Sequence, residues 1–299
     1  MSIPFVHDVN IKHGIVERLS PLVRRIFAPN PGIFTYTGTG TFLVGQGEVA
    51  VIDPGPSIMR HVENILNGLD EGERISHIFV THTHKDHSPA AMHLSRFTGA
   101  TVYGFGPHGA GQQGGLDDEH VEEGADPHFI PDEAITSGEI LQGPDWTLEA
   151  IHTPGHTSNH LCFDLKEEKT LFSGDHVMGW STSIISPPDG DMALYFESLE
   201  ALKEMDHDLY RPTHGPAIEN PSAFVDAIIS HRKTREQKIL ETVKAGHSAV
   251  KDMVPVVYAD VDPGLYPAAE RSLLAHLIHL HDKGEIKANG PHGLETRYS

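Results

Sequence analysis

The decapeptide THTHKDHSPA at residues 81–90 follows the apolar run ISHIFV and precedes a stretch with helical spacing. His82 and His84 alternate along an extended chain, so their side chains point the same way, while Asp86 and His87 come in the turn before the next helix. A chance cluster of these groups in a core would leave several of them buried without partners, which costs several kcal/mol. The spacing therefore predicts four metal ligands at the end of a buried strand.

Three later segments supply further candidates, and each follows an apolar run. TPGHTSNH contributes His156, SGDH contributes Asp175 and RPTHG contributes His214. Each segment alone is typical of an ordinary turn, but together they complete a set of imidazoles and carboxylates that suits divalent metals. His176 directly follows Asp175 and either contacts substrate or has a supporting or surface role, whereas Cys162 in HLCFDL is expected to be a small core residue.

The segments between these motifs alternate between strand and helix patterns. Short apolar runs separated by Gly and Pro pairs predict a β-meander over residues 24–53, namely RIFAP, IFTYT, TFLVG and EVAVID. Further strands are expected in WTLEAIHT, HLCFDL and TLFSGD, and helices over residues 57–69, 89–97 and 192–205. The glycine-rich residues 104–115 lack the GKS or GKT ending of a phosphate loop, and we expect a mobile surface loop there. This order indicates an α/β protein.

The composition changes after Pro221. Two amphipathic helical stretches, residues 222–245 and 268–283, flank SAVKDMVPVVYAD, and the closing GEIKANGPHGLETRY reads as two short strands around a turn. This combination suggests a winged helix, so we expect a catalytic domain at residues 1–220 and a winged-helix-like domain at residues 221–299. The last helix has an apolar face that needs a partner surface, made by Leu273, Leu274, Leu277, Ile278 and Leu280. Three histidines of the same helix are expected to be solvated, namely His276, His279 and His281.

The charge is strongly negative and unevenly distributed. The chain has 22 Lys and Arg against 42 Asp and Glu, a formal net charge of −20, while residues 221–299 carry 10 of each sign, so residues 1–220 hold the whole excess. Such a field repels nucleic acids and anionic membranes. The one cysteine excludes an intrachain disulfide, and we find no apolar stretch with the length of a membrane span or the pattern of a signal peptide. A cytoplasmic protein without a membrane partner is expected.

The HxHxDH motif at residues 82–87 and the three later segments resemble, in their order, the signature of the metallo-β-lactamase superfamily over about residues 20–220. The segments GDHVMGWSTSIISPPDGDMALYFESLE and GPAIENP, with the tail, resemble the branch that contains beta-lactamase-like protein two and glyoxalase II-like enzymes. The resemblance implies a four-layer αββα sandwich followed by a winged helix. It also implies two metal sites, one held by His82, His84 and His156 and the other by Asp86, His87 and His214. Asp175 would bridge the two sites.

The resemblance further implies a hydrolase that uses two divalent metal ions, and zinc is expected from the imidazole and carboxylate set, with iron or manganese as alternatives. A hydroxide shared by the two metals would attack the substrate directly, without a covalent intermediate. Asp86 would orient this hydroxide and pass its proton on, which makes Asp86 the candidate catalytic residue. Residues 179–191, rich in Ser, Thr, Pro and Gly, are expected to line the mouth of the pocket.

The expected substrate is a small ester, thioester or related acyl compound. An alternative is an endoribonuclease or phosphodiesterase acting on single-stranded RNA, which the negative charge disfavours because each phosphate would be repelled. A third possibility is a metal-sensing winged-helix regulator. A DNA reader needs a basic recognition helix, but the helix in AERSLLAHLIHLHDK is leucine-rich and balanced in charge, so we expect it to pack against the hydrolase domain and form a lid.

Overall fold

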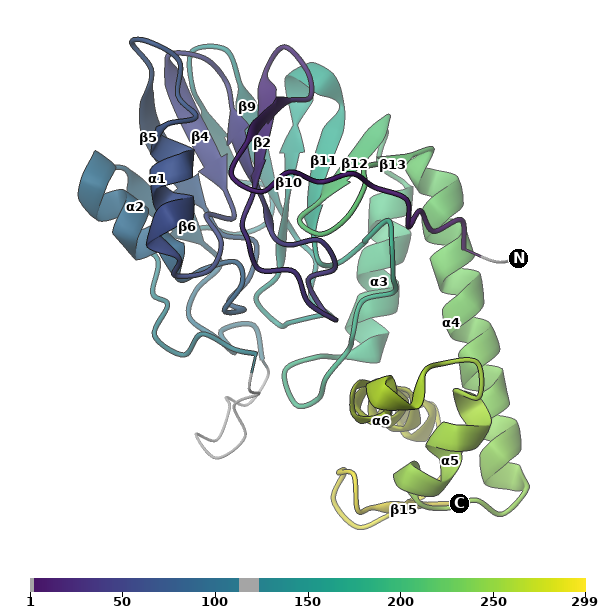
Figure 1. The fold of residues 1–299 in the computed structure, drawn as a ribbon. Coiled ribbons are helices and arrows are strands. Elements are labelled where there is room, and N and C mark those ends of the chain that lie inside the picture. The colour runs from purple at the N-terminus through teal and green to yellow at the C-terminus, as the bar shows by residue number, and fades with distance from the viewer. Residues whose placement is uncertain (1–2, 113–123) are drawn as a thin grey trace.

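Two β-sheets face each other and carry helices on their outer sides (Figure 1). The structure, a computed structural model, describes residues 3–112 and 124–299. Large apolar side chains fill the space between the sheets, among them Phe42, Phe79 and Trp146, each at most 1% exposed. The four layers confirm the predicted αββα sandwich.

The first sheet contains seven strands of the described chain, arranged in sequence order. Its strands are β1 Val16–Arg18, β2 Val23–Phe27, β3 Gly40–Val44, β4 Glu48–Ile52, β5 Arg74–Phe79, β6 Thr101–Gly104 and β7 Glu133–Ala134. Neighbours from β1 to β4 pair antiparallel, and neighbours from β4 to β7 pair parallel. Two helices, α1 (Met59–Leu66) and α2 (Ala90–Thr98), cover its outer face through a core that includes Val62, Ile65 and Leu94.

The second sheet has the order β13-β12-β11-β10-β9-β8 among the residues described. Its elements are β8 Ile140–Gln142, β9 Thr147–His152, β10 Leu161–Leu165, β11 Thr170–Gly174, β12 Leu209–Pro212 and β13 Ile218–Glu219, with the short 3₁₀ helix η2 Lys166–Glu168 after β10. The helix α3 (Met192–Lys203) covers its outer face. This helix begins at Asp191, whose carboxylate accepts a hydrogen bond from the Leu194 amide at 2.9 Å and so caps the helix.

The strands that precede the predicted ligands end at one edge of the sandwich. β4 and β5 are parallel, β11 and β12 are parallel, and β9 runs in the direction of β11 because both pair antiparallel with β10. His87, beyond β5, lies 3.5 Å from Asp175, beyond β11, so the two sheets share this edge. The carboxyl ends of parallel strands are the usual place for a site in such sheets. The motifs therefore converge because of strand direction.

Two glycines allow the turns after β9 and β11 to form. Gly155 has a φ of 138°, and a Cβ atom there would lie 2.4 Å from the Cα atom of Tyr195 in α3. Gly174 has a φ of 52°, and a Cβ atom there would lie 2.5 Å from Nε2 of His160. A side chain fits at neither position. These glycines are the reason that His156 and Asp175 can reach the shared edge.

The tail packs against the second sheet's helices and also has a core of its own. Its elements are α4 Pro221–Lys244, α5 Val250–Val257, the 3₁₀ helix η3 Pro263–Leu265, α6 Tyr266–Asp282, β14 Ala288–Asn289 and β15 Arg297–Tyr298. The long α4 lies beside α3 and extends down to α5 and α6 (Figure 1). The apolar face predicted for the last helix is covered, because Leu273, Leu277 and Leu280 are each at most 3% exposed. Within the described ranges, no helix combines the length and the apolar character needed to cross a bilayer.

The structure corrects one predicted element and adds one that was not predicted. IFTYT is not a strand: residues 33–37 turn back on themselves, with one bridge between Gly32 and Tyr36, and part of the segment lines a cavity. The connection SAVKDMVPVVYAD contains the helix α5, which Pro255 inside it concealed. Gly104 ends strand β6 and residues 105–112 form bends and turns, but Phe105 stacks on His152 at 4.1 Å, so this part is held to the body. Residues 113–115 of the same loop lie outside the described residues.

The predicted solvated face of α6 is also wrong for two of its three histidines. His276 is fully buried, and His279 lies 2.8 Å from the Glu236 carboxylate of α4. The reason is that α6 packs against both α3 and α4. His281, near the end of α6, remains partly exposed beside Asp282.

We predict that replacing Ile228 by Ala destabilises the protein by about 2–5 kcal/mol, because the side chain is buried at 1% exposure in a cluster shared by α3 and α4. Val256→Ala is the control, since Val256 is 41% exposed and should change stability by no more than about 0.5 kcal/mol. Guanidinium unfolding monitored by circular dichroism measures both values. Equal effects of the two substitutions would mean that the tail is not packed on the two-sheet body.

Candidate metal centre

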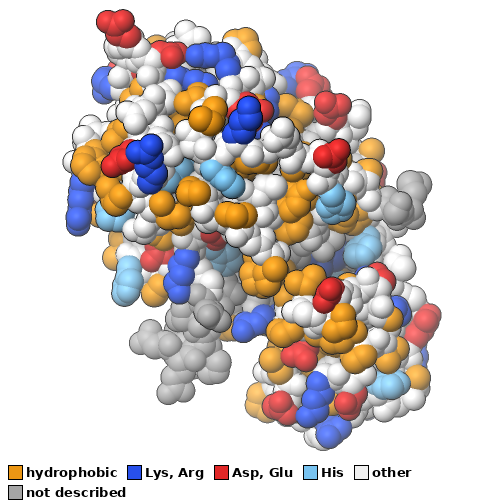
Figure 2. Space-filling model, viewed as in Figure 1, with side chains coloured by type: hydrophobic (Ala, Val, Ile, Leu, Met, Phe, Trp, Pro, Cys, Tyr) orange, Lys and Arg blue, Asp and Glu red, His pale blue; other side chains and the backbone are white. Residues whose placement is uncertain are grey.

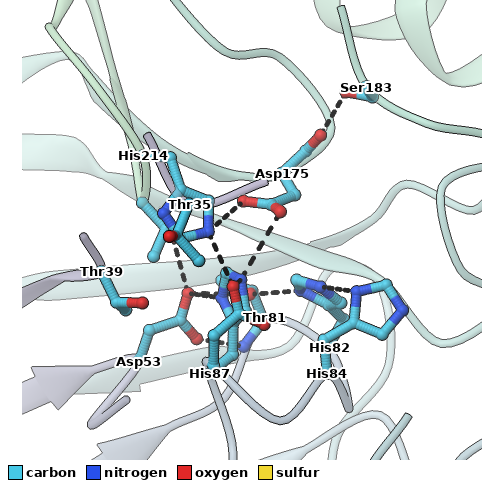
Figure 3. A network of polar contacts seen from close by, with 12 residues as sticks. Thr35, Thr39, Asp53, Thr81, His82, His84, His87, Asp175, Ser183 and His214 are labelled. Carbon is cyan, nitrogen blue, oxygen red and sulfur yellow. Dashed lines mark hydrogen bonds and ion pairs between the residues drawn. The ribbon is translucent and has the colours of Figure 1, made fainter. Parts of the chain in front are cut away.

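The seven predicted ligands come together where the strands end. Figure 3 shows His82, His84, His87, Asp175 and His214 among them. In the first group, Nδ1 of His84 lies 2.9 Å from Nε2 of His82 and 3.2 Å from Nε2 of His156. The three ligand atoms lie within 4.8 Å of one another. Three imidazole nitrogens that converge on one point are a common arrangement for a zinc-sized ion.

The second group contains Asp86, His87 and His214, whose ligand atoms also lie within 4.8 Å of one another. Oδ2 of Asp86 is 3.0 Å from Nε2 of His214 and 3.6 Å from Nε2 of His87. His87 and His214 are fully buried, whereas the Asp86 side chain is 25% exposed and faces the cavity described below. Asp86 is therefore the member of this group that can reach a bound molecule.

Asp175 lies between the two groups, and its two oxygens face different partners. Oδ1 is 3.5 Å from Nε2 of His214, and Oδ2 is 3.5 Å from Nε2 of His87 (Figure 3). Oδ2 is also 3.9 Å from Nε2 of His156. One carboxylate thus contacts both groups. This is the position that a bridging ligand needs.

The donor set fits divalent metal ions. Nε2 of His87, Nε2 of His214 and Oδ1 of Asp175 are buried and lack a hydrogen-bond partner among the described residues, which is costly unless a cation takes that place. The opposite ring nitrogens are held: Nδ1 of His156 lies 2.6 Å from the carbonyl of Ile184, and Nδ1 of His214 lies 3.1 Å from the carbonyl of Gly38. Fixing Nδ1 in this way orients Nε2 toward a metal.

The sequence analysis missed Asp53, which organises the centre from behind. Its carboxylate is fully buried and accepts hydrogen bonds from the Thr81 amide at 2.8 Å, the Thr81 hydroxyl at 2.9 Å and the Thr213 hydroxyl at 2.7 Å. Nδ1 of His87 lies 2.8 Å from the same carboxylate. The only signal in the sequence was one acidic residue directly after the apolar run of β4.

The electrostatics of the two groups differ. Burial lowers the pKa of His82 well below its ordinary value, and nearby His87 lowers it further, so its ring is neutral. Burial also opposes a charge on His87, but Asp86, Asp175 and Asp53 together raise its pKa well above the ordinary value. Burial opposes ionisation of Asp175 as well, yet His214 and His87 hold its pKa at about 2. The second group therefore attracts positive charge, which a divalent ion can supply in place of protons.

Two further histidines lie behind the ligands. The Asp175 amide donates to Nε2 of His160 at 3.2 Å, and Nδ1 of His160 lies 2.9 Å from the Thr153 hydroxyl, so His160 helps to fix the backbone of Asp175. His176 is fully buried beside Tyr195, with ring centroids 4.6 Å apart, and does not line the cavity. Burial lowers the pKa of His176 to about 3.

Cys162 is buried as predicted, and burial raises the pKa of its thiol to about 12, so it is no nucleophile.

A cavity of about 500 Å³ opens above the ligands, a size typical of small-molecule sites. His84, Asp86, His156 and Asp175 form part of its lining. The other walls come from three parts of the chain: residues 33–35, the segment after β11 from Met178 to Ser186, and Pro267, Ala268 and Arg271 of α6. The predicted pocket-mouth segment therefore lines the cavity through its first half. In the space-filling view the surface is hollowed where the tail meets the body, with hydrophobic side chains along the edges (Figure 2).

Comparisons with known proteins agree with this architecture. Residues 36–214 match the metallo-beta-lactamase superfamily, and residues 249–292 match the beta-lactamase associated winged helix domain. A beta-lactamase domain protein from Burkholderia ambifaria has the same fold, with a TM-score of 0.77, 21% identity and coverage of 98% of this chain and 95% of that one. A metallo-beta-lactamase family protein from Thermus thermophilus gives a TM-score of 0.73 at 19% identity, with 94% and 99% covered.

Similar sequences include fungal proteins named as thioesterases. An atrochrysone carboxyl ACP thioesterase from Cryptosporiopsis sp. is 30% identical over 267 residues, which cover 84% of this chain and 76% of the relative. A second atrochrysone carboxyl ACP thioesterase, from Pseudocercospora fijiensis, is 31% identical over 251 residues, which cover 81% and 69%.

We predict that Asp53→Asn weakens binding of a divalent metal ion at His87 by about 10–100-fold, with zinc as the probe, because an amide cannot accept all the hydrogen bonds that orient His87. Competition with a chromophoric chelator measures the affinity, and circular dichroism checks the fold. Asp252→Asn, an exposed position on α5, is the matched control and should bind zinc like the unaltered protein. Unchanged zinc affinity in a folded Asp53→Asn variant would contradict this role.

Proposed function

The chain belongs to the metallo-beta-lactamase superfamily and is a hydrolase, and we propose that it holds two divalent metal ions and cleaves a small acyl substrate, a thioester in the first place. The observation that carries the proposal is the position of Asp175, whose carboxylate lies 3.9 Å from His156 of the first ligand group and 3.5 Å from both His87 and His214 of the second. His82, His84 and His156 would hold one ion, and Asp86, His87 and His214 the other. Zinc is the proposed metal because five imidazoles and two carboxylates suit it.

The chemistry divides between the metals and the protein. Two divalent ions in these sites would lower the pKa of a water molecule between them and polarise the acyl oxygen. Asp86, at the cavity and 3.0 Å from Nε2 of His214, is placed to take a proton from that water. The oxygen of water would bond to the acyl carbon, the carbon–sulfur bond would break with its electron pair on sulfur, and the proton from Asp86 would complete the thiol. The products are a carboxylic acid and a thiol.

Size and charge support a small acyl substrate over RNA. The cavity of about 500 Å³ suits one compact group, and much of its wall is apolar, including Phe34, Met178 and Trp180. Residues 1–220 carry the whole net charge of −20, which would oppose each phosphate of an approaching strand. The thioesterase names of the fungal relatives support the choice of a thioester.

A winged-helix regulator is disfavoured by the packing of α6. Eight residues of this helix are buried, including Leu273, Ala275 and Leu277, and Arg271, which is exposed, lies at the cavity. A recognition helix must present a side to the major groove. The packing of α6 favours a structural role for the tail beside the hydrolase domain. We propose that residues 1–220 and 221–299 form two domains that act together.

The substrate class can be tested with the zinc-loaded protein on a matched panel: a thioester, the corresponding oxygen ester, a lactone, a β-lactam, a bis-aryl phosphodiester and single-stranded RNA. We expect the thioester to have the highest kcat/KM. A highest kcat/KM for the phosphodiester or rapid cleavage of RNA would replace the acyl proposal with the nuclease alternative.

Metal content gives a separate prediction. Elemental analysis should find about two metal ions per chain after reconstitution, and a strong chelator should remove the metal together with the activity. Asp175→Ala should lower the metal content and the rate far more than His176→Ala, because Asp175 contacts His156 of one ligand group and His87 and His214 of the other, whereas His176 does not line the cavity. A saturated preparation with one ion per chain, or equal losses in the two variants, would refute the dinuclear assignment.

A further inference from the structure

The tail brings a cation to the cavity above the metal centre. Arg271 lies on the first half of α6 and lines the same cavity as His84, Asp86 and Asp175. We propose that the substrate is an apolar acyl thioester that carries a carboxylate away from the scissile bond, and that Arg271 binds this carboxylate. The inference rests on the proposed function and adds the chemical class of the acyl group.

The guanidinium of Arg271 is available for an anion. Its Nη1 donates to the Ser186 hydroxyl at 3.2 Å, a neutral partner, and no described carboxylate forms an ion pair with it. In contrast, Arg235 of α4 pairs with Asp260 at 3.2 Å. Guanidinium has five N–H donors in a planar fork that matches a carboxylate in two-point contact. Ser186 fixes one side of the group and leaves donors for a ligand.

The charge balance of the cavity also favours an anionic group. Its described lining includes the cationic side chain of Arg271 and two carboxylates, Asp86 and Asp175. Both carboxylates are the proposed metal ligands, and two divalent ions would carry four positive charges against them. The loaded cavity is then positive, although the whole chain carries −20. Charges separated by more than about 8 Å in solvent are largely screened, so the local balance decides which group binds inside.

The remaining wall is apolar and held in place. The ring of Trp180 stacks on Tyr36 with centroids 4.8 Å apart and an angle of 11° between the planes. A Cβ atom on Gly215 would lie 2.7 Å from Trp180, so the indole packs closely on the backbone behind it. Phe34 and its neighbour Ile33 are 51% and 66% exposed and both line the cavity, so together they offer an apolar surface that a ligand can cover. An apolar acyl chain between these rings is the group that such a wall accepts.

The test compares two series of N-acetylcysteamine thioesters with acyl chains of increasing length, one ending in methyl and the other in carboxylate. The zinc-loaded full-length protein should prefer the carboxylate series by about 10- to 100-fold in kcat/KM at one favoured length, the size expected for a charge-assisted hydrogen bond. Arg271→Met should remove this preference. Arg271→Lys should retain part of it, because the charge remains and the two-point contact is lost.

The control is Lys251→Met, which removes one positive charge from an exposed position of α5 and should leave the preference as it is in the unaltered protein. A second readout needs no turnover: calorimetry with the free acids should show the diacid binding at least about tenfold more tightly than the monoacid of equal length, and Arg271→Met should equalise them.

The outcomes separate this inference from the proposed function. Hydrolysis of both series with no preference, and equal binding of the two acids, would overturn the role of Arg271 and leave the thioesterase proposal intact. Selective binding of the diacid without hydrolysis would support the carboxylate site and refute the thioesterase. A coenzyme A thioester can be compared with the N-acetylcysteamine thioester of the same acyl group. If Arg271→Met removed a preference for the phosphates of coenzyme A, and not a preference for the acyl carboxylate, Arg271 would lie on the thiol side and the inference would be overturned.

Discussion

The buried Asp53 carboxylate holds together the parts of the chain that make the site. It forms hydrogen bonds with Thr81 and His87, which follow β5 of the first sheet, and with Thr213, which follows β12 of the second. It therefore connects the two sheets at the edge where both end. A carboxylate without these partners would be very costly to bury. The hydrogen bonds that stabilise its charge therefore also fix the direction of His87 and the position of His214, and the geometry of the metal centre follows from the stability of the fold.

The sequence predicted the seven candidate ligands because each lies in a short motif directly after an apolar strand, where strand direction brings them to one edge. Asp53 could not be predicted in this way. Its partners are Thr81, His87 and Thr213, up to 160 residues away, and only the folded sheets bring them to its side. The prediction of a strand at IFTYT was wrong for a related reason, because its apolar residues are spaced as in a strand but line a cavity. Helix α5 was not predicted because Pro255 lies inside it.

The tail differs from the prediction in a way that bears on its role. Buried histidines on α6 were expected to be solvated, because the sequence gives no sign that this helix has neighbours on more than one side. His276 is enclosed and His279 contacts Glu236 of α4, so α6 is fixed to α4 by polar as well as apolar contacts. A helix held in this way can place Pro267, Ala268 and Arg271 at the cavity with little freedom. Such preorganisation reduces the entropy lost on binding.

The two parts of the chain therefore contribute different chemistry to one cavity. The sandwich provides the proposed metal ligands and the proposed proton acceptor Asp86, and its negative charge both attracts metal ions and disfavours polyanions. The tail is neutral in sum, so it can present a cation at the cavity without attracting nucleic acid along its surface. An acyl group with a single carboxylate satisfies both conditions, because its apolar chain matches the wall of Phe34 and Trp180 and its one charge meets Arg271. Selectivity then depends on the distance between the metal centre and α6, which the packing of α4 against α3 sets.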